Sequence, residues 1–214
     1  MEIGPHDVFL VVDVQVDFTT GSMAIPGAET VIEPINTTAE RFDHIIVVTD
    51  WHPVGHVSFA SAHPGTRHGD TVDVAYGQQR VWNDHCVQGS VGAQLHPDLE
   101  PDKAELVFRK GYRSEVDSSG AFWENDLDTR TGLGDYLNGR GFKRVFVAGL
   151  ARYGCVTQTA LGAVRYGFDV VILDDASAGR PPDTDAEAAD LSTIAAANIG
   201  WVVSTDLFPS RGRA

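Results

Sequence analysis

The sequence has few of the features that would set it apart from an ordinary globular protein. It contains only two cysteines, Cys86 and Cys155, which cannot build a disulfide framework and favour a reducing, cytoplasmic environment. No stretch resembles a signal peptide or a membrane span, since the apolar run at residues 8–12 is only a strand long. Repeats, low-complexity tracts and Gly/Ser-rich linkers are also missing. We therefore expect one domain over residues 1–214, ending in a flexible tail at 209–214.

Basic residues are scarce as well, with 16 Lys and Arg against 30 Asp and Glu and a net charge of −14 at pH 7. This excess of negative charge argues against a nucleic-acid backbone or an anionic membrane as partner. The hydrophobic residues, 43% of 214 positions, suffice for a sizeable core. The composition leaves small-molecule chemistry and homo-oligomer formation open.

Six apolar runs read as strands, and most are continuous rather than alternating, which is typical of a parallel sheet buried on both faces. They are Val8–Asp13, His44–Thr49, Glu105–Arg109, Arg144–Ala148, Asp169–Leu173 and Trp201–Ser204. Helical patterns fall between most of them, at about Glu29–Phe42, Leu133–Arg140, Cys155–Tyr166 and from a capping box at Thr184 to about Asn198. This alternation predicts an α/β fold of three layers, α/β/α, around a six-stranded parallel sheet.

The region between the second and third predicted strands, residues 50–104, has no sustained helical period. Five of the eight histidines crowd into it: His52, His56, His63, His68 and His85. A long irregular loop inside a compact domain is often functional. We expect this loop region to bind a metal.

Four chemically complementary residues stand at the carboxyl ends of predicted strands: Asp13, Asp50, Lys110 and Cys155. Ligands of open parallel sheets bind in the crevice outside these ends. The alternative is four unrelated loop residues, since Asp and Lys often begin loops. Their coherent chemistry favours a site.

Cys155 is the candidate nucleophile, although a lone cysteine is more often a buried packing residue. A helix N-terminus and the ammonium of Lys110 would lower the pKa of its thiol. Asp13 could take the thiol proton and return it to a departing amine. Gly154 would permit a tight turn, and the backbone amides of Ala151 and Cys155 could face an oxyanion.

A second set of residues has the composition of a divalent-metal site. "TDWHPVGH" contains Asp50, His52 and His56, and "WNDHCVQGS" adds His85. One carboxylate with two or three imidazoles suits such an ion and leaves positions open to water or substrate. The alternative is a loop aspartate beside surface histidines. Histidines 6, 44, 63, 68 and 96 are interpreted as surface residues, and Cys86 as packing.

Nearly the whole chain resembles the nicotinamidases of the isochorismatase-like cysteine hydrolase superfamily. The resemblance rests on the order and spacing of "VDVQVDF", "TDWHP", "HVSFA", "WNDHCVQGS", "KG" and "GLARYGCV". It implies a six-stranded parallel sheet with helices on both sides. It also implies a catalytic triad of Asp13, Lys110 and Cys155, and a cis peptide bond between Leu150 and Ala151.

The resemblance further implies a metal bound by Asp50, His52 and His85, with His56 as a histidine that ligates in some members and not in others. The metal of relatives holds the pyridine nitrogen while the cysteine attacks the carboxamide. Phe18 and Trp82 match aromatic positions that flank the ring. We expect one divalent ion, zinc before iron or manganese.

The chain departs from the family pattern at Val16, at Asn83 and, beside the nucleophile, at Arg152, Tyr153 and Gly154. The last three stand where the family has Thr, Asp and an aromatic residue. Because Gly154 offers no side-chain volume, we expect a roomier pocket unless Tyr153 or Arg152 refills it, and Arg152 could add positive charge at the mouth.

The resulting hypothesis is a metal-dependent nicotinamidase that hydrolyses nicotinamide to nicotinate and ammonia through a cysteine thioester. The nearest alternative is a related amidohydrolase acting on a different or bulkier amide or lactam, such as a streptothricin-type hydrolase. A non-catalytic binding protein of the same fold is disfavoured, because it would not need all three triad residues.

Overall fold

A central sheet of parallel strands organises the computed structural model, which describes residues 1–181, 185–197 and 199–207. Its strands are β1 (Asp7–Val12), β2 (Ile45–Asp50), β5 (Leu106–Lys110), β6 (Arg144–Leu150), β7 (Asp169–Ala178) and β8 (Gly200–Val202). They lie in the order β5-β2-β1-β6-β7-β8, and every neighbouring pair is parallel. This confirms the predicted sheet.

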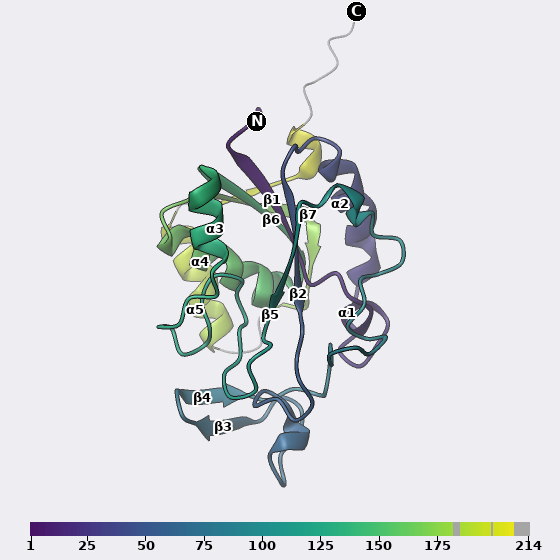
Figure 1. The fold of residues 1–214 in the computed structure, drawn as a ribbon, viewed down its shortest axis with the longest axis vertical. Coiled ribbons are helices and arrows are strands. Elements are labelled where there is room, and N and C mark those ends of the chain that lie inside the picture. The colour runs from purple at the N-terminus through teal and green to yellow at the C-terminus, as the bar shows by residue number, and fades with distance from the viewer. Residues whose placement is uncertain (182–184, 198, 208–214) are drawn as a thin grey trace, which may run out of the picture.

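Helices cover both faces of the sheet, which gives the expected three layers. They are α1 (Val16–Thr19), α2 (Ile32–Ala39), α3 (Leu133–Arg140), α4 (Thr157–Arg165) and α5 (Asp185–Ala196). Figure 1 shows α3, α4 and α5 on one side of the sheet and α1 and α2 on the other. In the described part of the chain, no helix is long and apolar enough to cross a membrane.

The side chains of β1 alternate between the two halves of the core, and all six of its residues are buried. Val8, Leu10 and Val12 pack with α3, α4 and α5, whereas Phe9 and Val11 pack with α2. Because both faces of β1 are covered, its sequence is continuously apolar rather than alternating.

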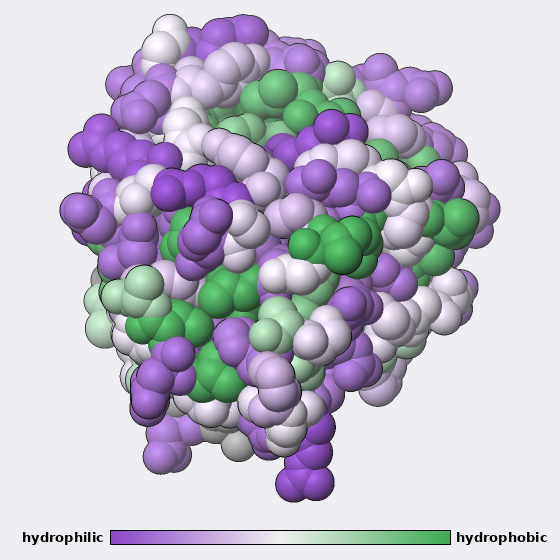
Figure 2. Space-filling view, turned by 60° about the horizontal axis from the view of Figure 1, so that its bottom comes forward, coloured by the Kyte–Doolittle hydropathy of each residue, from purple (hydrophilic) through white to green (hydrophobic). Residues whose placement is uncertain are grey.

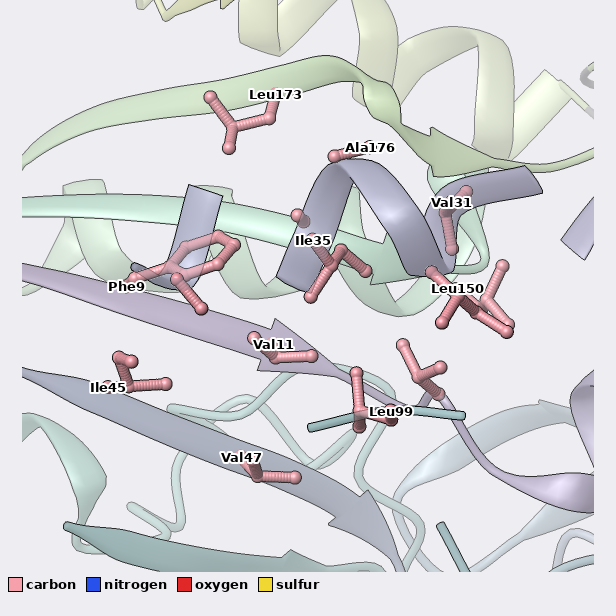
Figure 3. Packing of buried hydrophobic residues seen from close by; sticks show 14 of the residues in the cluster. Phe9, Val11, Val31, Ile35, Ile45, Val47, Leu99, Leu150, Leu173 and Ala176 are labelled. Atoms are coloured by element: carbon pink, nitrogen blue, oxygen red, sulfur yellow. The ribbon is translucent and has the colours of Figure 1, made fainter. Parts of the chain in front are cut away.

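The α2 side of the core is built around a few large side chains (Figure 3). Ile35 of α2 lies over Phe9 and Val11 of β1, and each of the three is at most 2% exposed. Burying one such side chain contributes about 1.5–3 kcal/mol. This packing fixes α2 against the strands whose ends carry the candidate site.

Several predicted boundaries shift in the structure. The helix expected at 29–42 is a 3-10 turn at Ala28–Val31 followed by α2, and Pro34 lies in the first turn of α2, where its missing N–H costs nothing. β7 runs beyond the predicted end, Leu173, to Ala178. The capping residue Thr184, the predicted helix end at Asn198 and the expected tail at 209–214 lie outside the described residues.

The region 50–104 contains regular structure that the sequence did not predict. Thr71–Val74 (β3) and Gly77–Arg80 (β4) form an antiparallel hairpin, and Ala60–Ala62 form a 3-10 turn. The hairpin lies below the carboxyl ends of the central strands in Figure 1. Figure 2 turns this end toward the reader, and hydrophobic side chains form separate patches there among hydrophilic ones.

One glycine brings β6 close to the end of β1. Gly149 has φ +124° and pairs with Val12, and a Cβ at Gly149 would collide with the Val12 carbonyl. A residue without a side chain is therefore required here. The close approach sets Asp13, which follows Val12, beside the segment that carries Cys155.

Candidate active site

Four neighbouring strands deliver the four predicted side chains to one place. Asp50 ends β2 and Lys110 ends β5, and the two residues pair in register. Asp13 follows β1 with φ +53°, and Cys155 follows β6. The order β5-β2-β1-β6 makes these strand ends adjacent, as the carboxyl-edge argument predicted.

Lys110 stands at the centre of this group. Its ammonium lies 3.0 Å from Asp13 Oδ2 and 2.5 Å from Asp50 Oδ1, and it donates a hydrogen bond to Cys155 Sγ at 3.5 Å. Lys110 is 1% exposed and Asp13 is 0% exposed, so the charges interact with little screening by water. The structure thus brings together the three residues predicted as a triad and joins them to Asp50.

The ionisable groups of this cluster have their pKa values shifted in different directions. Burial opposes the charge of Lys110, but Asp13 and Asp50 outweigh it and hold the pKa of the lysine well above its usual range. Burial likewise opposes the charge of Asp50, yet Lys110 holds the pKa of that carboxyl well below its usual range. For Asp13, burial and repulsion from Asp50 prevail and raise the pKa to about 7. Of these groups, Asp13 is therefore the one whose pKa lies near neutral pH.

The expectation of a lowered thiol pKa at Cys155 is wrong. Burial raises the pKa of the Cys155 thiol well above its usual value, and Lys110 only opposes this rise. The predicted helix start at Cys155 is wrong as well, because α4 begins at Thr157 and Cys155 lies in an irregular turn at Arg152–Val156. The thiol therefore rests protonated and needs a base when it reacts.

The turn before Cys155 has the backbone arrangement that the resemblance implied. The peptide bond between Leu150 and Ala151 is cis. The Ala151 carbonyl accepts hydrogen bonds from the Gly154 and Val156 amides at 3.0 and 3.2 Å. Ala151 and Cys155 both line the pocket described below.

Asp50, His52 and His85 bring their ligating atoms within 4.8 Å of one another. The Nε2 atoms of His52 and His85 lie 3.6 and 3.7 Å from Asp50 Oδ2. Asp50 thus turns one carboxylate oxygen toward Lys110 and the other toward the two imidazoles. All three residues are buried.

Hydrogen bonds on the far side of each ring show that this cluster fits a metal. His52 Nδ1 lies 2.8 Å from the Gly111 carbonyl, and His85 Nδ1 lies 2.8 Å from the Asn83 carbonyl. A carbonyl can only accept, so each Nδ1 carries a proton, and Nε2, the nitrogen that faces Asp50, is the atom that would bind a metal ion. Two imidazole nitrogens and a carboxylate are a donor set for zinc and similar divalent ions.

His56 has a different hydrogen-bond arrangement. Its Nδ1 accepts from the Ser58 amide at 3.3 Å and lies 2.7 Å from Ser58 Oγ. Burial lowers the pKa of His56, so the ring is neutral. Its Nε2 is buried with no hydrogen-bond partner among the described residues, and the ring groups with His52 and Asp117 rather than with Asp50 and His85.

Gly111 shapes the metal-ligand cluster directly. It follows Lys110 with φ +64°, and a Cβ at this position would collide with the His52 ring. A glycine here both adopts the left-handed conformation and leaves room for His52 against its own carbonyl. Of the "KG" pair, Lys110 therefore belongs to the group around Cys155, and Gly111 makes room for the metal-ligand cluster.

Asp117 is a site residue that sequence reasoning missed. Its carboxylate groups with His52 and His56, again with the ligating atoms within 4.8 Å. Gln79 of β4 donates to Oδ2 at 3.2 Å, and the Ser118 amide donates to Oδ1 at 2.8 Å. No strand ends at Asp117, so the only available signal was the polar triplet 117–119 shortly after Lys110.

A cavity of about 460 Å³ opens above Cys155. Its wall includes the metal-ligand cluster, Phe18 and Trp82. A loop at residues 23–26 closes one side. The remaining lining residues are Ser22, His68, Asn83, Asp117, Ser118, Ser119, Ala151, Tyr153, Gly154, Gly179 and Arg180. Phe18 and Trp82, the two aromatic residues expected beside a substrate ring, thus both line the cavity. The loop at 23–26 was not predicted.

Three other expectations can be compared with the structure. Arg152 does not line the cavity; its Nη1 lies 2.9 Å from Asp174 Oδ1, so the expected charge at the mouth is not supplied by this residue. His96 is buried rather than at the surface, and its Nδ1 accepts from the Asp98 amide. Cys86 is fully buried, which agrees with a packing role, and burial raises the pKa of its thiol.

A model of the isochorismatase domain matches residues 7–206, which is most of the chain. The chain belongs to the isochorismatase family. Within this family, a curated nicotinamidase from Acinetobacter baylyi is 44% identical over 168 residues, covering 78% of each chain. A solved Acinetobacter baumanii nicotinamidase pyrazinamidease superposes with a TM-score of 0.91 at 40% identity, covering 96% of this chain and 99% of that one.

Two further family members were solved with ligands. PnC1 from L. infantum, in complex with nicotinate, superposes with a TM-score of 0.78 at 36% identity and covers 93% of both chains. The pyrazinamidase of Pyrococcus horikoshii, in complex with zinc, superposes with a TM-score of 0.74 at 29% identity. It covers 93% of this chain and 99% of its own.

The alternative sequence hypothesis has weaker support within the family. A streptothricin hydrolase from Streptomyces noursei is 30% identical over 87% of this chain, but the match spans only 56% of that protein. The comparisons therefore favour the nicotinamidase hypothesis.

Proposed function

We propose that this chain hydrolyses nicotinamide to nicotinate and ammonia through a thioester on Cys155. The observation that carries the proposal is the contact of Lys110 with both Asp13 and Cys155, at the floor of a cavity that also contains a metal-ligand cluster. The similarity to nicotinamidases supports the choice of substrate. The site supports the type of reaction.

The first step forms the thioester precursor. Asp13 accepts the Cys155 proton as Sγ attacks the carboxamide carbon, and the electron pair of the C=O bond moves onto its oxygen. The backbone amides of Ala151 and Cys155 stabilise that oxyanion. Lys110 keeps its positive charge beside the developing thiolate and so compensates for the burial that raises the thiol pKa.

The second step releases ammonia, and the third releases the acid. Asp13 returns its proton to the nitrogen, the C–N bond breaks and the thioester remains on Cys155. Water then attacks the thioester carbon while Asp13 removes one of its protons. The C–S bond breaks, Asp13 gives that proton to Sγ, and the acid leaves and ionises to nicotinate. Asp13 thus serves in turn as base and acid in each half of the reaction, a task suited to its pKa of about 7.

We propose that Asp50, His52 and His85 hold one divalent ion, zinc before iron or manganese. A bound ion would supply a Lewis-acidic position for the pyridine nitrogen of the substrate. Phe18 and Trp82 would flank the ring of that substrate. His56 stays outside this proposed set, because its ring groups with His52 and Asp117 rather than with Asp50 and His85.

Other parts of the proposal rest on the sequence. Residues 1–214 would form one domain in the cytoplasm, with neither nucleic acid nor membrane as partner and with a homo-oligomer compatible with the composition. The excess of acidic residues supports the exclusion of anionic partners.

The experiment that tests the function is ammonia release from nicotinamide beside a panel of other primary amides, with the ring opening of lactams followed in parallel by mass spectrometry. The proposal expects nicotinamide to be turned over, and Cys155→Ala to abolish turnover while the far-ultraviolet circular dichroism stays unchanged. Ring opening of lactams without ammonia release from nicotinamide would contradict it.

A further inference from the structure

The cavity has open space beside the nucleophile at Gly154. Gly154 precedes Cys155 and lines the cavity, and an ideal Cβ built on it would meet only the Ala151 methyl group, at 3.8 Å. That is an ordinary van der Waals contact, so the backbone leaves room for a side chain that the sequence does not provide. The wall of the cavity is recessed at this position.

The neighbouring side chain of Arg152 does not fill the recess. Its Nη1 lies 2.9 Å from Asp174 Oδ1, and its Nε donates to the Ser177 carbonyl at 3.1 Å. Its guanidinium lies 5.3 Å from the ring centre of Trp201. These contacts hold Arg152 against the ends of β7 and β8 rather than over Cys155.

Tyr153 is part of the cavity wall, but the cavity remains large with Tyr153 in place. Its volume of about 460 Å³ falls in the range of roughly 300–1,000 Å³ that holds drug-sized ligands. A single-ring amide fills only part of it. The metal-ligand cluster, Phe18 and Trp82 line the same cavity, and the recess at Gly154 adds space beside the reacting carbon.

We propose that this cavity accepts aromatic carboxamides larger than nicotinamide, namely pyridine carboxamides with an added ring substituent or a fused second ring, and hydrolyses them at Cys155. The inference rests on the proposed function and names its substrate class. Gly154 is then a specificity-determining residue, because a large side chain there would occupy the volume that the extra carbons need. The reaction itself, and its proton transfers, are those of nicotinamide.

The test compares kcat/KM for nicotinamide, 5-methylnicotinamide and isoquinoline-4-carboxamide. The two larger amides keep the ring nitrogen and the carboxamide in the same relation as nicotinamide and add a methyl group in the first and a fused ring in the second at the same edge of the ring. The wild-type protein is expected to hydrolyse both with kcat/KM within about tenfold of nicotinamide, since added carbons that meet no wall avoid the loss of roughly 10–200-fold that a misfitting methylene would cause.

The variant Gly154→Phe fills the recess and is expected to lower the ratio of bicyclic to nicotinamide kcat/KM by at least about tenfold. Gly154→Ala should shift the same ratio in the same direction by a smaller factor. Gly139→Phe is the matched control, because Gly139 is exposed in α3 and its Cβ would meet nothing within 4 Å. The control should leave the ratio unchanged.

Calorimetric binding of isoquinoline-4-carboxamide to Cys155→Ala gives a readout that does not depend on the folding of Gly154→Phe. Binding within about tenfold of nicotinamide supports the inference. Turnover of nicotinamide with neither binding nor turnover of the larger amides overturns it and leaves the proposed function standing. An unchanged ratio in both Gly154 variants also overturns it. Failure to hydrolyse nicotinamide would instead refute the proposed function.

Discussion

Lys110 donates a hydrogen bond to Cys155 across 3.5 Å, and this contact joins the ends of β5 and β6, which are separated by two strands in the sheet. The same ammonium contacts Asp13 and Asp50, the residues at the ends of the two intervening strands. The lysine therefore links the nucleophile, its base and a metal-ligand residue in one buried cluster. A substitution at any of these four residues should therefore change the pKa values of the other three.

Replacing Lys110 by Met should raise the pKa of the Cys155 thiol further, because the ammonium is the main group that opposes the effect of burial. An adjacent opposite charge typically shifts a pKa by about 1–3 units. Alkylation of Cys155 by iodoacetamide near neutral pH should slow by about tenfold or more. Lys103→Met, at an exposed position, is the control. An unchanged pH profile of alkylation in Lys110→Met would remove the lysine from this role.

The pH dependence of kcat/KM should show an acid limb near pH 7. Burial and Asp50 raise the pKa of Asp13 to about 7, and only the deprotonated carboxylate can accept the thiol proton. Activity should therefore fall about tenfold per pH unit below that value and level off above it. Asp13→Asn should lower kcat/KM by more than the ~10²–10⁴-fold expected for the loss of a single general base, if Asp13 also orients Lys110 and Cys155. A kcat/KM that stays constant over roughly pH 5–8, measured at constant ionic strength, would contradict this assignment.

Metal content should separate the three histidines. We expect His52→Ala and His85→Ala to lose the ion, because each removes one Nε2 lone pair beside Asp50. His56→Ala should retain about one ion per chain, since His56 groups with His52 and Asp117 rather than with Asp50 and His85. Elemental analysis of the purified variants measures this directly. Loss of the ion in His56→Ala, or full occupancy after replacement of both His52 and His85, would contradict the ligand set.

Gly111→Ala should weaken metal binding by about 10–100-fold, as substitutions behind a ligand commonly do, because the new methyl group would displace the His52 ring. Gly132→Ala is a matched control for the backbone cost, since Gly132 also has positive φ, and its Cβ would meet nothing within 4 Å. Titration with a chelator compares the two variants. Equal metal affinity in both would mean that Gly111 gives His52 no necessary space.

The sequence predicted the sheet because strands covered on both faces, such as β1, are continuously apolar. It did not predict the β3–β4 hairpin, whose short polar strands depend on distant contacts such as that of Gln79 with Asp117. Asp117 was not predicted either, because it does not follow the end of a strand as the other site residues do. The pKa direction of Cys155 was wrong because burial depends on packing from several segments, which local spacing does not reveal.

The position of Arg152 was equally beyond local reasoning. Its partner Asp174 lies in β7, a strand that runs beyond the end predicted from its apolar residues. Only the extended strand brings the Asp174 and Ser177 groups within reach of the guanidinium. The residue next to the nucleophile thus turns away because of a boundary that the sequence pattern did not give.

Peptide mapping by mass spectrometry, on wild-type protein quenched with acid during turnover of nicotinamide, tests the central claim most directly. The account predicts a nicotinoyl adduct on the peptide containing Cys155, none on the peptide containing Cys86, and full activity in Cys86→Ala. An adduct on Cys86, or wild-type turnover by Cys155→Ala, would contradict it.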